Sequence, residues 1–224
     1  DEDRYVKSVE IVEVNDVDNQ AGTGRETVGG RYIFHHMIWS TAQLDENGDR
    51  IEDTVTSWPV HEVGRNPDLF DPDGGRLLRA GTYIYSDSVH LHSNGLDTTG
   101  HLEIGFRFHP KGYEPKYQRA ILGLGNGVDI SIAGNQDGQE LHAYRVLEEH
   151  TKIITFEPHL HAPGERMCLE AIWGYTVETL SCVGYDHNWV RGYAYEADAA
   201  PLLPKGTILH IAVSYTHLTL PTSG

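Results

Sequence analysis

The segment RMCLEAIWGYTVETLSCVG (166–184) decides the class of fold. Polar and apolar residues alternate in RMCLEAIW (166–173) and again in VETLSCVG (177–184). This period of two is typical of β-strands that have one face in a core and one face outside it. A turn centred on Tyr175 would join the two strands as an antiparallel hairpin, in which opposing residue numbers sum to 350. The segment therefore predicts a β-hairpin.

The same alternation recurs along most of the chain. It is present in YVKSVEIVEV (5–14), RYIFHHMIWS (31–40), GTYIYSDSVHLHS (81–93), GHLEIGFRFHP (100–110), TKIITFEPHLH (151–161), VRGYAYEA (190–197) and GTILHIAV (206–213). Clusters rich in Gly, Asp, Asn and Pro separate these segments, as expected for turns. No segment has the period of a three-turn helix. We therefore predict an all-β fold of two tandem jelly-roll β-sandwich domains.

The segment HPKGYEPKYQRA (109–120) interrupts the alternation with two prolines, a glycine and mixed charges. We expect an N-terminal domain at 1–115 and a C-terminal domain at 116–213, each of ordinary size. The tail SYTHLTLPTSG (214–224) resembles translated adapter sequence, so we expect it to be non-native. The opening DEDRYVKSVE (1–10) lacks the pattern of a secretory leader and an initiator Met, so we expect a mature, clipped or partial chain.

Composition excludes some classes of partner. Of the 224 residues 39% are hydrophobic, which is enough for a core, and 17 basic against 33 acidic residues give a formal charge of −16. Such a charge repels phosphate backbones and anionic lipid, so we expect neither nucleic acid nor a membrane surface as partner. No apolar run approaches the roughly 20 residues that cross a bilayer, so we expect no membrane span.

Two segments place histidines one residue apart. PHLH contains His159 and His161, and VHLH contains His90 and His92. Residues i and i+2 of a strand point to the same face, so each pair can chelate one metal ion without distortion. Both segments run into turns, where functional sites concentrate. The alternative is an ordinary polar strand face.

A third segment, FHHM, contains the adjacent histidines His35 and His36. Adjacent strand residues face opposite sides, so both could bind one ion only if the strand twists or if they use different ring nitrogens. The structural alternative is one histidine in the core and one in solvent. Neutral imidazole suits zinc, copper and iron, whereas the scarcity of nearby carboxylates disfavours calcium and magnesium. His109 lies beside a turn, and the remaining histidines are interpreted as scattered surface or packing residues: His61, His101, His142, His150, His187 and His210.

Cys168 and Cys182 are the two cysteines, and their numbers also sum to 350. Opposing Cβ atoms lie about 4.5–5.5 Å apart, while a disulfide prefers about 3.5–4.5 Å. Either a disulfide or two small buried apolar side chains is compatible with this spacing. A disulfide would imply an extracytoplasmic protein, periplasmic or secreted.

Long stretches resemble the copper type II, ascorbate-dependent monooxygenases, the family of peptidylglycine α-hydroxylating monooxygenase and dopamine β-monooxygenase, and especially their bacterial relatives. PHLHAPGERMCLEAI (158–172) and ETLSCVGYDHNWVRGYAYEADAAPLLPKGTILHI (178–211) resemble the C-terminal domain of that family. HHM (35–37) and VHLHSNGLDTTGHLEIGFRFHPKGY (89–113) resemble its N-terminal domain. The resemblance covers roughly residues 5–213.

The resemblance implies two copper ions. The electron-transfer copper would be held in the N-terminal domain by His35, His36 and His92, with His90 as the alternative to His92. The oxygen-binding copper would be held in the C-terminal domain by His159 and His161.

In the family a methionine nearer the C-terminus completes the second site, and here the sequence departs from the pattern. Met37 and Met167 are the only methionines, neither stands at that position, and Met167 is expected to pack in its strand. A thioether favours Cu(I), so its loss should weaken copper binding at the C-terminal pair.

The implied function is hydroxylation of an aliphatic C–H bond of a small molecule with dioxygen and ascorbate or a similar reductant. No acid or base residue is nominated. The alternatives are a non-catalytic or degenerate copper-binding protein on the same fold, a zinc-dependent hydrolase, which lacks an obvious Glu ligand, and a lectin-like module using NWVRGYAY (188–195). The Arg and Tyr that hold a peptide carboxylate in the family have no counterpart, so peptide amidation is not implied. Substrate, reductant and oligomeric state stay open.

Overall fold

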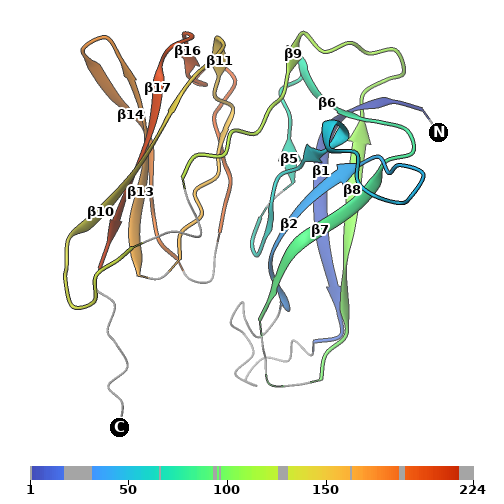
Figure 1. The fold of residues 1–224 in the computed structure, drawn as a ribbon, viewed down its shortest axis with the longest axis horizontal. Helices are drawn as coiled ribbons and strands as arrows, with labels where there is room; N and C mark the ends of the chain where they lie inside the picture. The colour runs from blue at the N-terminus through green and yellow to red at the C-terminus, as the bar shows by residue number, and fades with distance from the viewer. Residues whose placement is uncertain are drawn as a thin grey trace. The chain divides into compact units, whose positions relative to one another are not determined.

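The computed structural model describes residues 2–17, 32–65, 67–92, 95, 97–125, 131–161, 163–186 and 190–216. Regular structure in these residues is strand, apart from one short 3-10 helix, η1 (Glu52–Thr54), so the prediction of an all-β fold is confirmed. The chain divides into two compact units, Asp1–Ile121 and Leu122–Gly224 (Figure 1). This division falls six residues after the boundary expected at residue 115.

The N-terminal unit contains two sheets. Its strands are β1 (Arg4–Asn15), β2 (Phe34–Ala42), β3 (Thr56–Ser57), β4 (His61–Glu62), β5 (Asp68–Leu69), β6 (Gly74–Leu78), β7 (Tyr83–Leu91), β8 (Gly100–Phe108) and β9 (Tyr117–Gln118). β1 pairs antiparallel with β5, β6 and β8, and β6 pairs in parallel with β9. β2 pairs antiparallel with β3, β4 and β7.

One core joins these two sheets. Val6 and Val9 of β1 belong to the same buried cluster as Trp39 of β2 and Trp58. The two indole rings stack with centroids 5.7 Å apart, and the Trp58 Nε1–H donates to Thr41 Oγ1 at 2.9 Å. Buried tryptophans satisfy their N–H groups in this way, so the pair fills the space between the sheets without an unsatisfied donor.

The C-terminal unit is built on a four-stranded antiparallel sheet in the order β10-β17-β13-β14, with two smaller strand pairs, β11-β16 and β12-β15 (Figure 1). Its strands are β10 (Gln139–Val146), β11 (Thr151–Lys152), β12 (Thr155–Phe156), β13 (Gly164–Trp173), β14 (Thr176–Gly184), β15 (Tyr193–Ala194), β16 (Leu202–Leu203) and β17 (Ile208–Tyr215).

Only one face of this large sheet lies on the hydrophobic core. The odd-numbered residues Leu209, Ile211 and Val213 of β17 join Leu169 and Ala171 of β13 in the buried cluster, which also includes residues of β12 and β16. Since side chains alternate along a strand, the even-numbered residues of β17 and β13 lie on the opposite, outer face.

The predicted hairpin is present as β13 and β14, and a disulfide joins Cys168 to Cys182, whose Cα atoms are 4.1 Å apart. Around this bridge the numbers of opposing residues sum to 350, as predicted. Closer to the turn the predicted register is wrong by one residue, because Glu170 lies opposite Thr179 and Ile172 lies opposite Val177. An extra residue in β14 forms a β-bulge there, which moves the turn toward Gly174. Gly174 adopts φ 55°, a conformation that favours glycine.

Two other predicted segments are interrupted. TKIITFEPHLH (151–161) contains two strands of two residues each, β11 and β12, and its histidines lie outside regular structure. VRGYAYEA (190–197) is strand only at Tyr193–Ala194. Among the described residues, no helix has the length and apolar character that crossing a bilayer requires.

Candidate metal centres

A β-bulge brings the adjacent histidines of the N-terminal unit together. In the β2–β7 ladder Phe34 pairs with Leu91 and His36 pairs with His90, so His35 is an extra residue on β2. A regular strand would direct His35 and His36 to opposite faces, but a bulge redirects one of two successive side chains. Their ring centroids are accordingly 5.2 Å apart.

His35 and His36 each contact a histidine at the C-terminal end of β7. His35 Nδ1 lies 3.0 Å from His92 Nε2, and the His92 backbone N–H donates to the Ile33 carbonyl oxygen at 2.8 Å. The His36 ring lies against the His90 ring with centroids 4.1 Å apart. The order of contacts is therefore His92, His35, His36, His90. His92 therefore contacts His35 through ring nitrogens, whereas His90 packs on His36.

The polar surroundings of these histidines are mostly buried. His36 is 5% exposed, and its Cα partner on β4 is Glu62, which is also buried. Arg65 lies 3.5 Å from the Glu62 carboxylate, which compensates the buried negative charge. Next to Glu62, His61 is buried, and burial holds the pKa of this imidazole below its usual value.

The C-terminal pair lies between β12 and β13. His159 Nε2 and His161 Nε2 are 2.9 Å apart, with ring centroids 4.7 Å apart. The following turn closes with a hydrogen bond from the Gly164 N–H to the His161 carbonyl oxygen at 2.7 Å. A Cβ atom at Gly164 would lie 2.9 Å from that oxygen, so this tight turn requires glycine.

A pocket adjoins the C-terminal pair. Residues on both sides of His159 in the sequence contribute to its lining, together with residues after β14 and in β15: Pro158, Leu160, Tyr185, Asp186, Arg191 and Tyr193. The lining combines apolar rings and aliphatic groups with a carboxylate and a guanidinium. The cavity has a volume of about 30 Å³, which is room for water and not for an organic molecule.

The nitrogen spacings fit a shared metal ion. Two nitrogens that each lie 2.0–2.1 Å from one ion are separated by about 2.9–3.4 Å for bond angles near 90–110°. The measured 3.0 Å and 2.9 Å separations lie in this range. Neither pair has a third metal ligand in position: the described residues contain no group of three His, Cys, Asp or Glu side chains able to hold a metal ion. His36 would have to turn toward the His35–His92 pair.

Both methionines lie in cores. Met37 is 8% exposed in the N-terminal cluster, and Met167 packs against the C-terminal cluster, which confirms the predicted packing of Met167. His109, which the sequence analysis placed beside a turn, is also buried. It contacts the Gly74 carbonyl oxygen at 3.0 Å and stacks on Tyr113 with centroids 3.8 Å apart, a packing arrangement.

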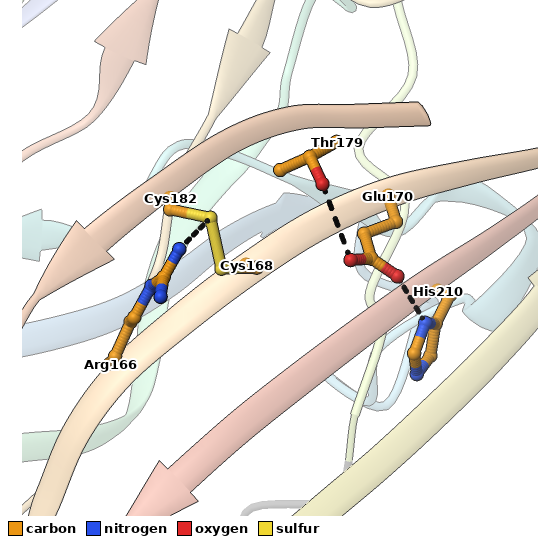
Figure 2. Close-up of a disulfide and its surroundings, with 6 residues drawn as sticks. All are labelled: Arg166, Cys168, Glu170, Thr179, Cys182 and His210. Carbon is orange, nitrogen blue, oxygen red and sulfur yellow. Dashed lines mark hydrogen bonds and ion pairs between the residues drawn. A yellow bond between two sulfur atoms is a disulfide. The ribbon is translucent and has the colours of Figure 1, made fainter. Parts of the chain in front are cut away.

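The fold brings together His142 and His210, which the sequence interpretation treated as scattered surface or packing residues. They lie on neighbouring strands with His142 Nδ1 3.0 Å from His210 Nε2. Glu170 contacts the other side of His210 (Figure 2). The two histidines are 68 residues apart, and β10, which carries His142, was not among the predicted strands. The alternation in QELHAYRV (139–146) is compatible with a strand, but it does not contain the register that joins the two histidines.

No protein-family model matches this chain, and no curated protein sequence matches it either. The resemblance to copper monooxygenases therefore depends on the motifs in the sequence.

Proposed function

We propose that this chain is a copper-dependent monooxygenase that hydroxylates an aliphatic C–H bond of a small molecule, and that its two units are tandem jelly-roll domains. The observation that carries the proposal is the same in both units. At the positions the motifs select, each unit holds two imidazole nitrogens at a spacing that suits one metal ion: His35 with His92, and His159 with His161. Imidazole ligands suit copper.

In the N-terminal unit the bulge at His35 is the feature that assembles the ligands. It turns the His35 ring toward His92, and the buried His36 would have to turn toward this pair to become the third ligand. Bound copper would supply one-electron storage here and dioxygen reduction in the C-terminal unit.

In the C-terminal unit the chain would bind and orient the substrate beside the His159–His161 pair. Leu160, Tyr193 and Arg191, which line a small cavity near the pair, would be available to contact apolar and anionic parts of a substrate. The reaction requires two electrons from ascorbate or a similar reductant, and it places one oxygen atom in the product and one in water. The Cys168–Cys182 disulfide supports an extracytoplasmic location.

A second candidate is a non-catalytic copper-binding protein on the same fold. The observation that favours it is that Met37 and Met167, the two methionines of this sequence, pack in or against the hydrophobic clusters. A zinc-dependent hydrolase is less well supported, because no carboxylate joins either histidine pair in a three-donor group among the described residues. Such enzymes use three protein ligands and an open position.

Anaerobic titration with Cu(I) against a competing chelator tests copper binding. We expect two equivalents, with tighter binding at His35, His36 and His92 than at His159 and His161, because three imidazoles bind more tightly than two. His35→Ala should remove the tighter equivalent and His159→Ala the weaker one. The matched control is His101→Ala, at an exposed histidine outside both centres.

Equal affinities would contradict the asymmetry of the two centres, and no loss of copper in either variant would contradict the assignment of the ligands. Oxygen uptake with ascorbate separates the enzyme from the binder. A candidate small molecule that increases uptake by wild type, and not by His159→Ala, supports the enzyme. Tight copper binding with no substrate-dependent uptake across a broad panel of small molecules supports the binder.

A further inference from the structure

A second group of histidines lies across the outer face of the C-terminal sheet. His142 comes from β10, His210 from β17 and Glu170 from β13, three strands that are neighbours in the sheet. His210 is the Cα partner of Tyr144 on one side and of Glu170 on the other. These side chains lie opposite the hydrophobic core, yet His210 is only 8% exposed because its neighbours cover it.

Glu170 fixes the tautomer of His210. Glu170 Oε2 lies 2.9 Å from His210 Nδ1, and a carboxylate only accepts, so the proton of neutral His210 resides on Nδ1. His210 Nε2 then presents a lone pair toward His142 Nδ1 at 3.0 Å. His142 Nδ1 either donates its proton to this lone pair or, with the proton on Nε2, offers a second lone pair to a cation between the two rings.

We propose that His142 and His210 bind a divalent transition-metal ion of the zinc and copper class. A separation of 3.0 Å corresponds to an angle of roughly 95° at an ion with bonds near 2.05 Å. The spacing matches the pairs His35–His92 and His159–His161. Glu170 is the outer carboxylate that metal-bound histidines commonly have, and imidazole donors select against calcium and magnesium.

Neighbouring side chains hold His210 and Glu170 in position. The Tyr144 ring stacks on the His210 ring, with centroids 4.4 Å apart and planes at 5°, so His210 is held in one orientation. Glu170 is held in turn by Thr179, whose Oγ1 lies 3.4 Å from Glu170 Oε1 (Figure 2). The His142 side chain is 40% exposed, so an ion and its remaining water ligands can enter from solvent. A bound ion would tie the edge strand β10 to β17.

Zinc binding to the full chain tests the proposal, in a His35→Ala/His159→Ala background that disables both candidate copper centres. Isothermal titration calorimetry with Zn²⁺ at pH 7.5 should show one equivalent that disappears when His142→Ala is added. Glu170→Gln should weaken the same equivalent about 10- to 100-fold, as loss of an outer carboxylate usually does. The control His101→Ala removes an exposed histidine beside Glu103 in the N-terminal unit and should change nothing.

A second measurement locates the ion independently of folding losses in the variants. In imidazole ¹H–¹⁵N spectra of the background protein, Zn²⁺ should shift Nδ1 of His142 and Nε2 of His210, while Ca²⁺ should shift neither. Zinc should also raise the midpoint of thermal unfolding, and His142→Ala should abolish this increase. The proposal is overturned if the zinc equivalent survives His142→Ala, or if zinc leaves both nitrogens unshifted, in which case the two rings share only a hydrogen bond. Neither result depends on whether copper binds elsewhere.

Discussion

Replacing both cysteines with alanine should destabilise the C-terminal unit by an amount that the structure allows us to estimate. The disulfide joins residues 14 apart, so it closes a segment of 15 residues when both cysteines are counted. The chain-entropy estimate for such a loop is about 3 kcal/mol at 25 °C. Unfolded chains generally retain some local structure, which makes this value an upper limit.

The measurement is urea unfolding of wild type and of Cys168→Ala/Cys182→Ala at 25 °C, followed by the fluorescence of Trp173 in the C-terminal unit and of the buried Trp39 and Trp58 in the N-terminal unit. For an m-value of about 2 kcal/mol/M, a loss of about 3 kcal/mol lowers the midpoint by about 1.5 M. The N-terminal transition should stay where it is, because no residue of that unit belongs to the bridged segment.

A reductant supplies the control for this prediction. In dithiothreitol the wild type loses the same cross-link, so its midpoint should fall to within about 0.3 M of that of the double variant. The entropic reasoning is refuted if the double variant loses less than about 1 kcal/mol in the absence of reductant. It is equally refuted if the full difference persists in dithiothreitol, since the loss would then come from packing.

Three further outcomes follow from buried groups and close contacts. Gly164→Ala should lose about 1–3 kcal/mol in urea unfolding, because its Cβ would lie 2.9 Å from a backbone carbonyl oxygen, whereas Gly184→Ala, with 3.9 Å of clearance, should change stability little. Burial lowers the pKa of His61, so as pH falls through about 6.5 the unfolded chain takes up a proton at this residue before the folded chain does. The stability that depends on neutral His61 is therefore complete above that pH and decreases below it. His61→Leu should show a smaller loss of melting temperature between pH 7.5 and 5 than wild type. Thr41→Val removes the acceptor of the buried Trp58 indole N–H and should cost about 1–3 kcal/mol, which calorimetry would detect as a lower melting temperature.

The strands that the sequence predicted best are those with one clearly apolar face. In β17 and β13 the alternation of large apolar residues with polar ones matches the observed core face. β10 was missed because its core-facing residues include the small Ala143, which gives a weak signal. The segment ending in His159 and His161 was predicted as one strand, but only two short strands, β11 and β12, form there. Pro158, which cannot donate a ladder hydrogen bond, lies just after β12.

The candidate metal centres likewise include one contact that the sequence predicted and others that it did not. The spacing of His159 and His161 was enough to predict that their rings could share an ion, because residues i and i+2 need no knowledge of a partner strand. The same spacing does not explain why His35 joins His92, which depends on a bulge in the β2–β7 ladder. A single inserted residue changes the face to which a side chain points, and it leaves no mark on the alternation nearby.

The sequence alone therefore determined the all-β class and the types of ligand available. It did not determine which histidines meet, because His159 contacts His161 whereas the equally spaced His90 and His92 contact different histidines of β2. Only the tertiary structure decided which side chains from different strands meet. His142 and His210, 68 residues apart, lie 3.0 Å from each other because β10 pairs with β17 in one particular register. The physical reason is that strand register is fixed by burial of whole apolar faces and by bulges, which are properties of the assembled sheet and not of any local segment.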